Sequence, residues 1–392
     1  MLSVSETWSI LDSLAPDALL AERIPLAAAA GRMLREPILA PEDQPAFDRA
    51  AIDGYVAALD TPAGATLRLA GSIPVGQPAP AAPAPGDALK LFTGSAVPAG
   101  SVGLVMHEDS TASADRAKIT LHRAPSAHFI RRRASQARAG DTLLAAGLAL
   151  GPGALALLAS VGATQPLVTR RPRVAHLITG GEIVAPETTP ASGQIRDSNS
   201  TLLAALLAAA GADLTAHARA GEDFASASAG FAQLLHASPA PDVLLISGGS
   251  SRGDHDHAAR VLADHGFALA VNQVASRPGK PLLVATRGAQ IAFGLPGNPL
   301  SHFVCFHLFV ARILARLLGA APAPLLDLPL APGALLRTDP RETWWPATRT
   351  TQGYAPLPWA DSSDLTSLAR THALLRVPSA AAPETHATGI LV

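Results

Sequence analysis

The sequence predicts a multidomain α/β protein whose central part is a doubly wound domain with a mainly parallel sheet. Between about residues 170 and 319, short apolar runs alternate with helical patterns, which is the element order of such a fold. The apolar runs at 174–178 and 243–247 are continuous rather than alternating, as in strands that are covered on both faces. With 392 residues, of which 48% are hydrophobic and 16% charged, the chain can bury several cores.

The part of the chain before this domain divides into helical and β-rich segments. Residues 6–35 are predicted to form two short helical stretches, and residues 37–46 an extended segment rich in proline and acidic residues. From residue 55 to about 121, short β runs are separated by turn signals around Gly64 and Gly76. This pattern predicts a small β-rich lid subdomain.

Strands and helices of the central domain follow from its apolar runs and their flanking turn residues. Strands are expected at 174–178, 243–247, 282–285 and 291–293, and helices at 201–210, 224–236, 257–265 and from Pro299 onward. The short extended runs after residue 320 predict a small β-barrel-like domain. The predicted domains are 1–45 with 125–170 (N-terminal and linker), 46–124 (lid), 171–320 (α/β) and 321–392 (C-terminal β).

Composition excludes several classes of protein. A net charge of -1 argues against a nucleic-acid binder. One cysteine, Cys305, rules out an intrachain disulfide framework and fits a reducing compartment. The N-terminus has no secretory-signal pattern, and the apolar stretch 303–319 contains His307 and two arginines, which favours a buried core helix over a membrane span. We therefore expect a cytoplasmic protein.

Three glycine-bearing loops are the candidates for a binding site. Residues 179–182, 247–254 and 294–299 each follow a predicted buried strand. Ligands of open α/β sheets bind beyond the carboxyl ends of the strands, where glycines let backbone N–H groups approach an anion. Any one of these loops could be an ordinary tight turn, but three at the same edge favour a ligand site.

Acidic side chains accompany these loops. Glu182, Asp254 and Asp256 end two of them, and Asp223 precedes a predicted helix. Carboxylates beside an anion repel it unless a cation lies between them, which predicts Mg²⁺ or another divalent cation bridging to phosphate. The alternative for Asp254 and Asp256 is that they cap the following helix.

Lys280 is a further candidate ligand for a phosphate or oxyanion. The chain prefers arginine and has only three lysines, and the lysine ammonium is a compact point charge. A plain surface lysine is the alternative. No His or Cys partners of His255, His257 or His302 have zinc spacing, so a structural zinc is not expected.

Several segments together resemble the molybdopterin molybdenumtransferase family (MoeA and the gephyrin E domain) over nearly the whole chain. Their order and spacing make the resemblance specific. The segments are 47–55 (FDRAAIDGY), 92–98 (FTGSAVP), 171–174 (RPRV), 179–182 (TGGE), 193–199 (GQIRDSN), 247–256 (SGGSSRGDHD), 278–281 (PGKP) and 294–301 (GLPGNPLS).

The resemblance implies an elongated homodimer that binds adenylylated molybdopterin, replaces its adenylyl group with molybdate and releases AMP with the help of a divalent cation. A molybdopterin adenylyltransferase or a molybdoenzyme maturation factor would be its partner. Carried over by position, the acids of the reaction would be Asp53, Glu182, Asp223 and Asp256, and the metal would be held by Glu182, Asp254 and Asp256. The ligand would be bound by Thr93, Gly94, Thr179, Gly180, Asn199, Ser247, Gly248, Gly249, Ser251, Lys280, Pro296, Gly297, Asn298, Pro299, Ser301 and, by a weaker match, Ser362.

The chain also departs from the family pattern. Ser135 and Gln136 stand where the family has two acids, Gly181 replaces an aspartate, and Arg49 and Arg252 add positive charge. Three readings follow: an active molybdenum insertase, a paralogue that binds molybdopterin or its cofactor as a carrier or maturation partner, and a related protein that adenylylates molybdopterin or acts on other nucleotides. The β-rich lid and the β tail favour the insertase layout.

Overall fold

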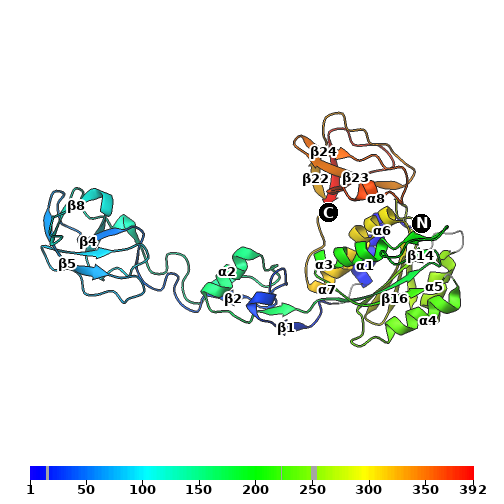
Figure 1. Ribbon diagram of the computed structural model, residues 1–392, viewed down its shortest axis with the longest axis horizontal. Helices are drawn as coiled ribbons and strands as arrows, with labels where there is room; N and C mark the ends of the chain where they lie inside the picture. Colours follow the sequence, from blue (N-terminus) through cyan, green and yellow to red (C-terminus); the bar gives the residue numbers. More distant parts are fainter. Residues whose placement is uncertain (15–16, 222, 249–253) are drawn as a thin grey trace.

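A computed structural model describes residues 1–14, 17–221, 223–248 and 254–392. The predicted site residues Gly249 and Ser251, and the departure at Arg252, lie outside the described residues, as do the side chains of Asp254 and Asp256. The molecule is elongated (Figure 1). A β-rich body lies at one end of the long axis, and the α/β body with the C-terminal sheet lies at the other end. Between them lies a small middle body with β1 (Ala21–Arg23), β2 (Ile38–Leu39) and α2 (Pro152–Ser160).

The α/β body is built on a six-stranded sheet in the order β16-β13-β17-β21-β20-β18. The first four strands of this order are parallel neighbours, and β20 pairs antiparallel with both β21 and β18. A turn of two residues joins β20 to β21, which is too short for a crossover and so makes that pair a hairpin. The mainly parallel α/β fold predicted from the sequence is confirmed. The strands are β13 (Arg173–Thr179), β16 (Asp213–Ala220), β17 (Val243–Gly248), β18 (Ala268–Asn272), β20 (Leu283–Arg287) and β21 (Gln290–Pro296).

Helices cover both faces of this sheet. Side chains of β13 alternate between two cores, with Val174 on one face and Ala175 and Leu177 on the other. The Val174 face packs against α1, α3 and the long helix formed by α6, a π-helical turn and α7, whereas α4 and α5 cover the opposite face. The helices are α1 (Val4–Leu14), α3 (Asn199–Ala209), α4 (Phe224–Leu235), α5 (Asp254–Asp264), α6 (Pro299–Cys305), the π-helical turn Phe306–Val310 and α7 (Ala311–Leu318).

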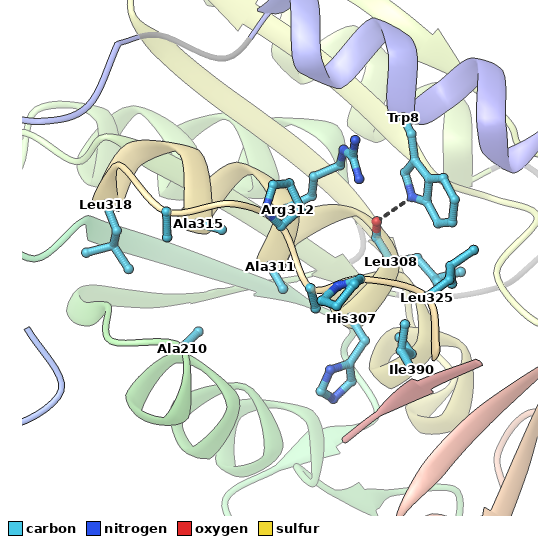
Figure 2. A pocket seen from close by; sticks show the side chains of 14 residues that line it. Trp8, Ala210, His307, Leu308, Ala311, Arg312, Ala315, Leu318, Leu325 and Ile390 are labelled. Carbon is cyan, nitrogen blue, oxygen red and sulfur yellow. Dashed lines mark hydrogen bonds between the residues drawn. The ribbon is translucent and has the colours of Figure 1, made fainter. Parts of the chain in front are cut away.

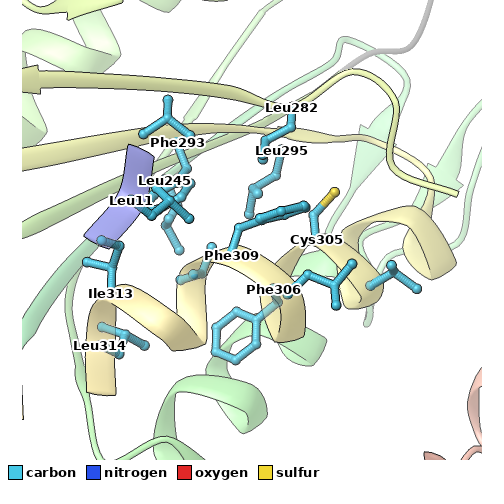
Figure 3. Packing of buried hydrophobic residues seen from close by; sticks show 14 of the residues in the cluster. Leu11, Leu245, Leu282, Phe293, Leu295, Cys305, Phe306, Phe309, Ile313 and Leu314 are labelled. Atoms are coloured by element: carbon cyan, nitrogen blue, oxygen red, sulfur yellow. The ribbon is translucent and has the colours of Figure 1, made fainter. Parts of the chain in front are cut away.

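The long apolar helix is a core element, as predicted. Among the described residues, Pro299–Leu318 is long and apolar enough to cross a membrane, but 72% of its most apolar window is buried inside the molecule. Figure 3 shows Phe309 of this helix pointing toward Leu245 and Phe293 of the sheet, whereas the ring of Phe306 lies on the other side of the helix within the same core. Its apolar composition is therefore explained by packing against the sheet.

One predicted element is wrong. The second helical stretch expected within 6–35 is instead strand β1 (Ala21–Arg23), paired with β12 (Leu167–Thr169), and a single 3₁₀ turn at Leu26–Ala28. The Leu26 amide donates to the Thr164 carbonyl at 2.9 Å. Pairing with a segment more than 140 residues away satisfies this backbone, so its local helical pattern does not decide the structure.

Smaller elements complete the middle body, the lid and the site. They are α2 (Pro152–Ser160), the paired strands β2 (Ile38–Leu39) and β11 (Thr142–Leu144), the paired strands β3 (Arg49–Ala50) and β10 (Ile130–Arg131), the paired strands β14 (Ile183–Val184) and β15 (Ile195–Arg196), and 3₁₀ turns at His107–Asp109 and Ala127–Phe129.

Two further sheets complete the described chain. The lid sheet has the order β7-β4-β6-β5-β9-β8, and the C-terminal sheet has the order β19-β23-β25-β26-β22 with β24 beside β23. Trp344, Leu374 and Ile390 of the C-terminal part are buried in the same core as the long helix, which fixes this sheet to the α/β body. The strands are β4 (Gly54–Ala58), β5 (Thr66–Ile73), β6 (Asp87–Leu91), β7 (Val102–Met106), β8 (Ser110–Ala112), β9 (Lys118–Leu121), β19 (Ser276–Arg277), β22 (Leu326–Pro329), β23 (Glu342–Thr350), β24 (Gly353–Pro356), β25 (Ala373–Val377) and β26 (His386–Leu391), and α8 is Leu365–Leu368.

Candidate active site

The three glycine-bearing loops begin side by side at one edge of the α/β sheet. In the parallel register, Thr179 at the end of β13 is aligned with Gly248 at the end of β17, and Gly248 is aligned with Pro296 at the end of β21. Parallel strands bring their carboxyl ends to a common edge. The structure therefore brings together the loop starts that the sequence singles out.

A cleft of about 320 Å³ opens at this edge. The N-termini of α3 and α6 both border it, through Asn199 and Pro299, and helix N-termini favour anions. The predicted residues Glu182, Asn199, Gly248, Gly297, Asn298 and Pro299 line the cleft, together with Ile178, Ile183, Ile195, Arg196, Asp197, Ser198, Ser363 and Leu365.

Two glycines at the cleft allow close approach of the chain. A Cβ atom on Gly248 would lie 1.6 Å from Oγ1 of Thr179, which is a severe clash. Gly180 has φ +146°, and a Cβ there would lie 2.8 Å from Oε2 of Glu182. Only glycine lets the ends of β13 and β17 lie this close, so these residues shape the cleft through the absence of a side chain.

Buried acceptor atoms in the cleft have no partner among the described residues. Oε2 of Glu182 and Oδ1 of Asn199 are buried without a hydrogen bond, whereas Nδ2 of Asn199 donates to the Gly297 carbonyl at 2.6 Å. Buried carboxylate and amide oxygens require a donor or a cation. The cleft therefore carries two oxygens of the type that hard cations prefer.

The acids at the site have different surroundings. Asp197 is 5% exposed, accepts a hydrogen bond from the Ser200 amide at 2.9 Å, and lies 3.5 Å from the guanidinium of Arg219. Asp223 is the N-cap of α4 and accepts from the Ser226 amide at 2.8 Å, so the structure gives it a capping role. The described residues contain no group of three or more His, Cys, Asp or Glu side chains placed to hold a metal ion.

Four other predicted ligand residues, described next, do not line the cleft. Ser362 lies against the third loop, because its Oγ accepts from Nδ2 of Asn298 at 2.7 Å and its carbonyl accepts from the Leu300 amide at 3.0 Å. Ser301 is buried, at 4% exposure, and Lys280 is exposed and does not line the cleft. The side chain of Ser247 is fully buried and hydrogen-bonded to His176, so its hydroxyl does not face the cleft.

Asp53, Thr93 and Gly94 form a separate polar loop in the lid. Oδ1 of Asp53 accepts hydrogen bonds from the backbone amide of Thr93 at 2.7 Å and from its hydroxyl at 2.9 Å. The Thr93 amide and hydroxyl, helped by His107 and Lys90, lower the pKa of Asp53 below its usual value. Gly94 takes φ +90° in the same loop. Figure 1 places the lid and the α/β body at opposite ends, so one chain does not bring these residues to the cleft.

A larger cleft of about 510 Å³ lies elsewhere on the α/β body (Figure 2). Its walls come mainly from the long helix and the segment that follows it, and α1 contributes Trp8. Trp8 donates from Nε1 to the Leu308 carbonyl at 2.8 Å, and Arg312 pairs with Asp12 at 2.6 Å. None of the ligand residues predicted from the sequence lines this cleft, so the smaller one is the candidate active site.

Asp197, Arg196, Ser363 and Leu365 line the cleft but were not predicted. The first two belong to the segment 193–199, whose resemblance to the family singled out only Asn199. The other two enter from the C-terminal part, through a contact that no local pattern reports.

Comparisons with known proteins agree with this architecture. A family model of the MoeA N-terminal region (domain I and II) matches residues 2–162, and a model of a probable molybdopterin binding domain matches residues 175–316. The chain is 32% identical to a molybdopterin molybdenumtransferase of Nostoc sp., over 96% of this chain and 90% of that protein. It is 34% identical to molybdopterin molybdenumtransferase 2 of Mycobacterium tuberculosis, over 76% of this chain and 75% of that protein.

Solved structures give the same result for the fold. A crystal structure of a molybdopterin biosynthesis MoeA protein from Pyrococcus horikosii is 25% identical and has a TM-score of 0.79, covering 99% of this chain and 98% of that one. The middle body, the lid, the α/β body and the C-terminal sheet are thus all parts of a known arrangement.

Proposed function

The chain belongs to the molybdopterin molybdenumtransferase family, and we propose that it inserts molybdate into adenylylated molybdopterin with release of AMP. One observation carries the proposal. Three glycine-bearing strand ends converge on one cleft that contains a buried carboxylate oxygen of Glu182 with no partner in the described part of the chain. Such a cleft suits an anionic ligand bound together with a cation.

Two anionic reactants must meet at this edge of the sheet. Backbone N–H groups of the Gly248 and Gly297 loops and the N-termini of α3 and α6 would receive the phosphate of the pterin ligand. A divalent cation, Mg²⁺ in our proposal, would neutralise the phosphate and the leaving adenylyl group when bound. Glu182 would hold it together with Asp254 and Asp256, and the unpaired Oε2 of Glu182 fits such a role.

We further propose that the working unit is a homodimer in which the lid of one copy covers the cleft of the other. The polar loop of Asp53, Thr93 and Gly94 lies at the far end of its own chain, so it can contribute to catalysis only at the cleft of a second copy. The reaction would take place in the cytoplasm, with a molybdopterin adenylyltransferase upstream or a molybdoenzyme maturation factor downstream as partner.

The direct test supplies purified protein with adenylylated molybdopterin, molybdate and Mg²⁺ and follows AMP. We expect AMP release that requires both molybdate and the cation. Tight binding of adenylylated molybdopterin with no molybdate-dependent AMP would refute the insertase and favour a carrier or maturation partner. AMP release that is independent of molybdate would favour a different nucleotide chemistry.

The dimer proposal has its own test. Asp53→Asn and Glu182→Gln variants, each with at most about a tenth of wild-type activity in its own dimer, are unfolded, mixed in equal amounts and refolded together. A mixed dimer has one site built from an intact cleft and an intact lid, so random mixing should restore about a quarter of wild-type activity. If each site were built within one chain, mixing would restore none.

A further inference from the structure

A fully buried histidine lies directly beneath the candidate active site. His176 is in the middle of β13, and its Nε2 is hydrogen-bonded to the hydroxyl of Ser247 on the neighbouring strand β17. Ser247 is paired in register with Ile178, two residues along from His176, so both side chains lie on the same face of the sheet. The second ring nitrogen of His176 has no hydrogen-bond partner among the described residues.

Two further histidines surround this pair. His217 on β16 is the direct neighbour of His176 across the sheet, with ring centroids 5.1 Å apart. His302, near the start of α6, is fully buried, and among the described residues neither ring nitrogen has a hydrogen-bond partner of normal geometry, although the Pro296 carbonyl lies nearby. Burial lowers the pKa of His176 well below 6.5 and that of His302 to about 4, so both rings are neutral at pH 7.

This arrangement is not a nucleophilic Ser–His pair. Ser247 and His176 are both fully buried, and the hydroxyl of Ser247 is turned into the sheet face rather than toward the cleft. No carboxylate among the described residues is hydrogen-bonded to His176, whose other nitrogen is unpaired. A role in orienting the chain therefore fits the pair better than a role in attacking a substrate.

Ser247 is connected to the cleft through its backbone. It precedes Gly248, which lines the cleft and would clash with Thr179 if it carried a side chain. Gly248 is also aligned with Pro296 on β21. A rotation of Ser247 would shift Gly248. Because Gly248 lies against Thr179 and is paired with Pro296, the ends of β13 and β21 would shift with it.

We infer that His176 is a positioning residue, which holds the hydroxyl of Ser247 and thereby fixes the Gly248 edge on which the phosphate of the pterin ligand is bound. The inference rests on the proposed function for the identity of the ligand. It adds a residue that no motif of the sequence indicates, because His176 lies within an apolar strand run.

The test compares three variants. His176→Leu removes the ring, His176→Gln keeps a side chain that can hydrogen-bond Ser247, and Val174→Ala is a matched control on the same strand and face, buried in the apolar core. The dissociation constant of adenylylated molybdopterin is measured without molybdate, so that no turnover is needed. We expect His176→Leu to raise it about tenfold, equivalent to about 1.4 kcal/mol, His176→Gln to restore it to within about twofold, and Val174→Ala to lower only the unfolding temperature.

A double-mutant cycle with Ser247→Ala tests the route of the effect. If His176 acts through Ser247, the double variant binds no more weakly than Ser247→Ala alone. Additive losses, or a loss in Val174→Ala equal to that in His176→Leu, would overturn the inference. Should His176→Leu fail to fold, His176→Asn, whose shorter side chain does not reach the same position, takes its place.

Hydrogen exchange separates this inference from the proposed function. Peptides that contain Thr179 and Gly248 should exchange faster in His176→Leu than in His176→Gln or Val174→Ala, whatever ligand the cleft binds. Unchanged exchange at both residues would refute the positioning role even if the insertase assay succeeds. Faster exchange with no AMP release in the wild type would keep the positioning role and refute the insertase.

Discussion

The cleft of the α/β body and the polar loop of the lid are built on opposite principles. In the cleft, Oε2 of Glu182 and Oδ1 of Asn199 are buried and have no partner among the described residues. In the lid, Asp53 lies open to solvent and already accepts two hydrogen bonds from Thr93. The cleft thus needs a donor or a cation to be satisfied, whereas the lid loop is complete by itself. We therefore expect the cleft to bind the ligand and the cation. The lid would contribute a loop whose conformation is already fixed before it reaches the cleft of a second copy.

The sharpest test of this contrast is Glu182→Gln. The neutral amide keeps the shape of the side chain but cannot hold a cation as a carboxylate does. We expect turnover to fall about 100-fold, while the dissociation constant of adenylylated molybdopterin stays within about threefold. Steady-state AMP release and equilibrium binding measure the two quantities, and equal turnover in variant and wild type would remove Glu182 from the mechanism.

Gly248→Ala tests whether the cleft depends on close approach of its strands. The added methyl group would meet Oγ1 of Thr179 at 1.6 Å, so the strand ends must separate, at about 2 kcal/mol of unfolding free energy. Ligand binding should weaken with it, and Thr179→Ala in the same chain should restore part of both. Gly153→Ala in α2, where nothing lies within 4 Å of the new methyl group, is the control in a urea titration and should not lose stability.

Asp53→Asn tests the polar loop of the lid. Asparagine can still accept from Thr93, so the loop should keep its conformation, and only the negative charge is lost. We expect about a tenfold fall in turnover, with a normal dissociation constant for adenylylated molybdopterin and normal hydrogen exchange around Thr93. A large loss of binding would mean that the lid, and not only the cleft, supplies binding energy.

The smallest expected effect is a pH dependence of the α/β body. Its buried His302 has a pKa of about 4, against 6.5 when unfolded, so the unfolded state binds more protons between these values. The resulting stability is complete above about pH 6.5 and is lost as the pH falls toward 4.

Between pH 7 and pH 6 the protonation of this group in the unfolded state should lower the unfolding free energy by less than about 1 kcal/mol. Trp8 and Trp344 pack in the core of this body, so tryptophan fluorescence in urea reports on it. His302→Leu should have a smaller pH dependence than the wild type over this interval, and an identical dependence would contradict the assignment.

Much of the fold follows from local sequence patterns. The continuous apolar runs that became β13 and β17 predicted buried parallel strands, because only strands covered on both faces lack a polar alternation. The glycine loops after them predicted a ligand-binding site at one edge of the sheet, because the carboxyl ends of parallel strands lie at the same edge. These predictions needed no knowledge of distant contacts.

Other features depend on partners that are far away in the sequence. The segment Ala21–Arg23 has a helical pattern but pairs with Leu167–Thr169, and the strands at 283–287 and 290–296 form an antiparallel hairpin because their connection is too short for a crossover. Ser363 and Leu365 reach the cleft because the C-terminal sheet packs on the long helix. Periodicity describes one segment at a time and so cannot report such pairings.

The sequence by itself determined the α/β class, the three loops and the acidic and glycine residues that make this edge a site for a phosphate-bearing ligand. Only the tertiary structure decided which of these groups have hydrogen-bond partners within the protein. It turned the hydroxyl of Ser247 inward to His176 and made Asp223 the N-cap of α4. It left one buried oxygen of Glu182 without a partner among the residues that the structure describes. The physical reason is that a hydrogen bond depends on the position of both partners, and the sequence specifies only that each partner exists.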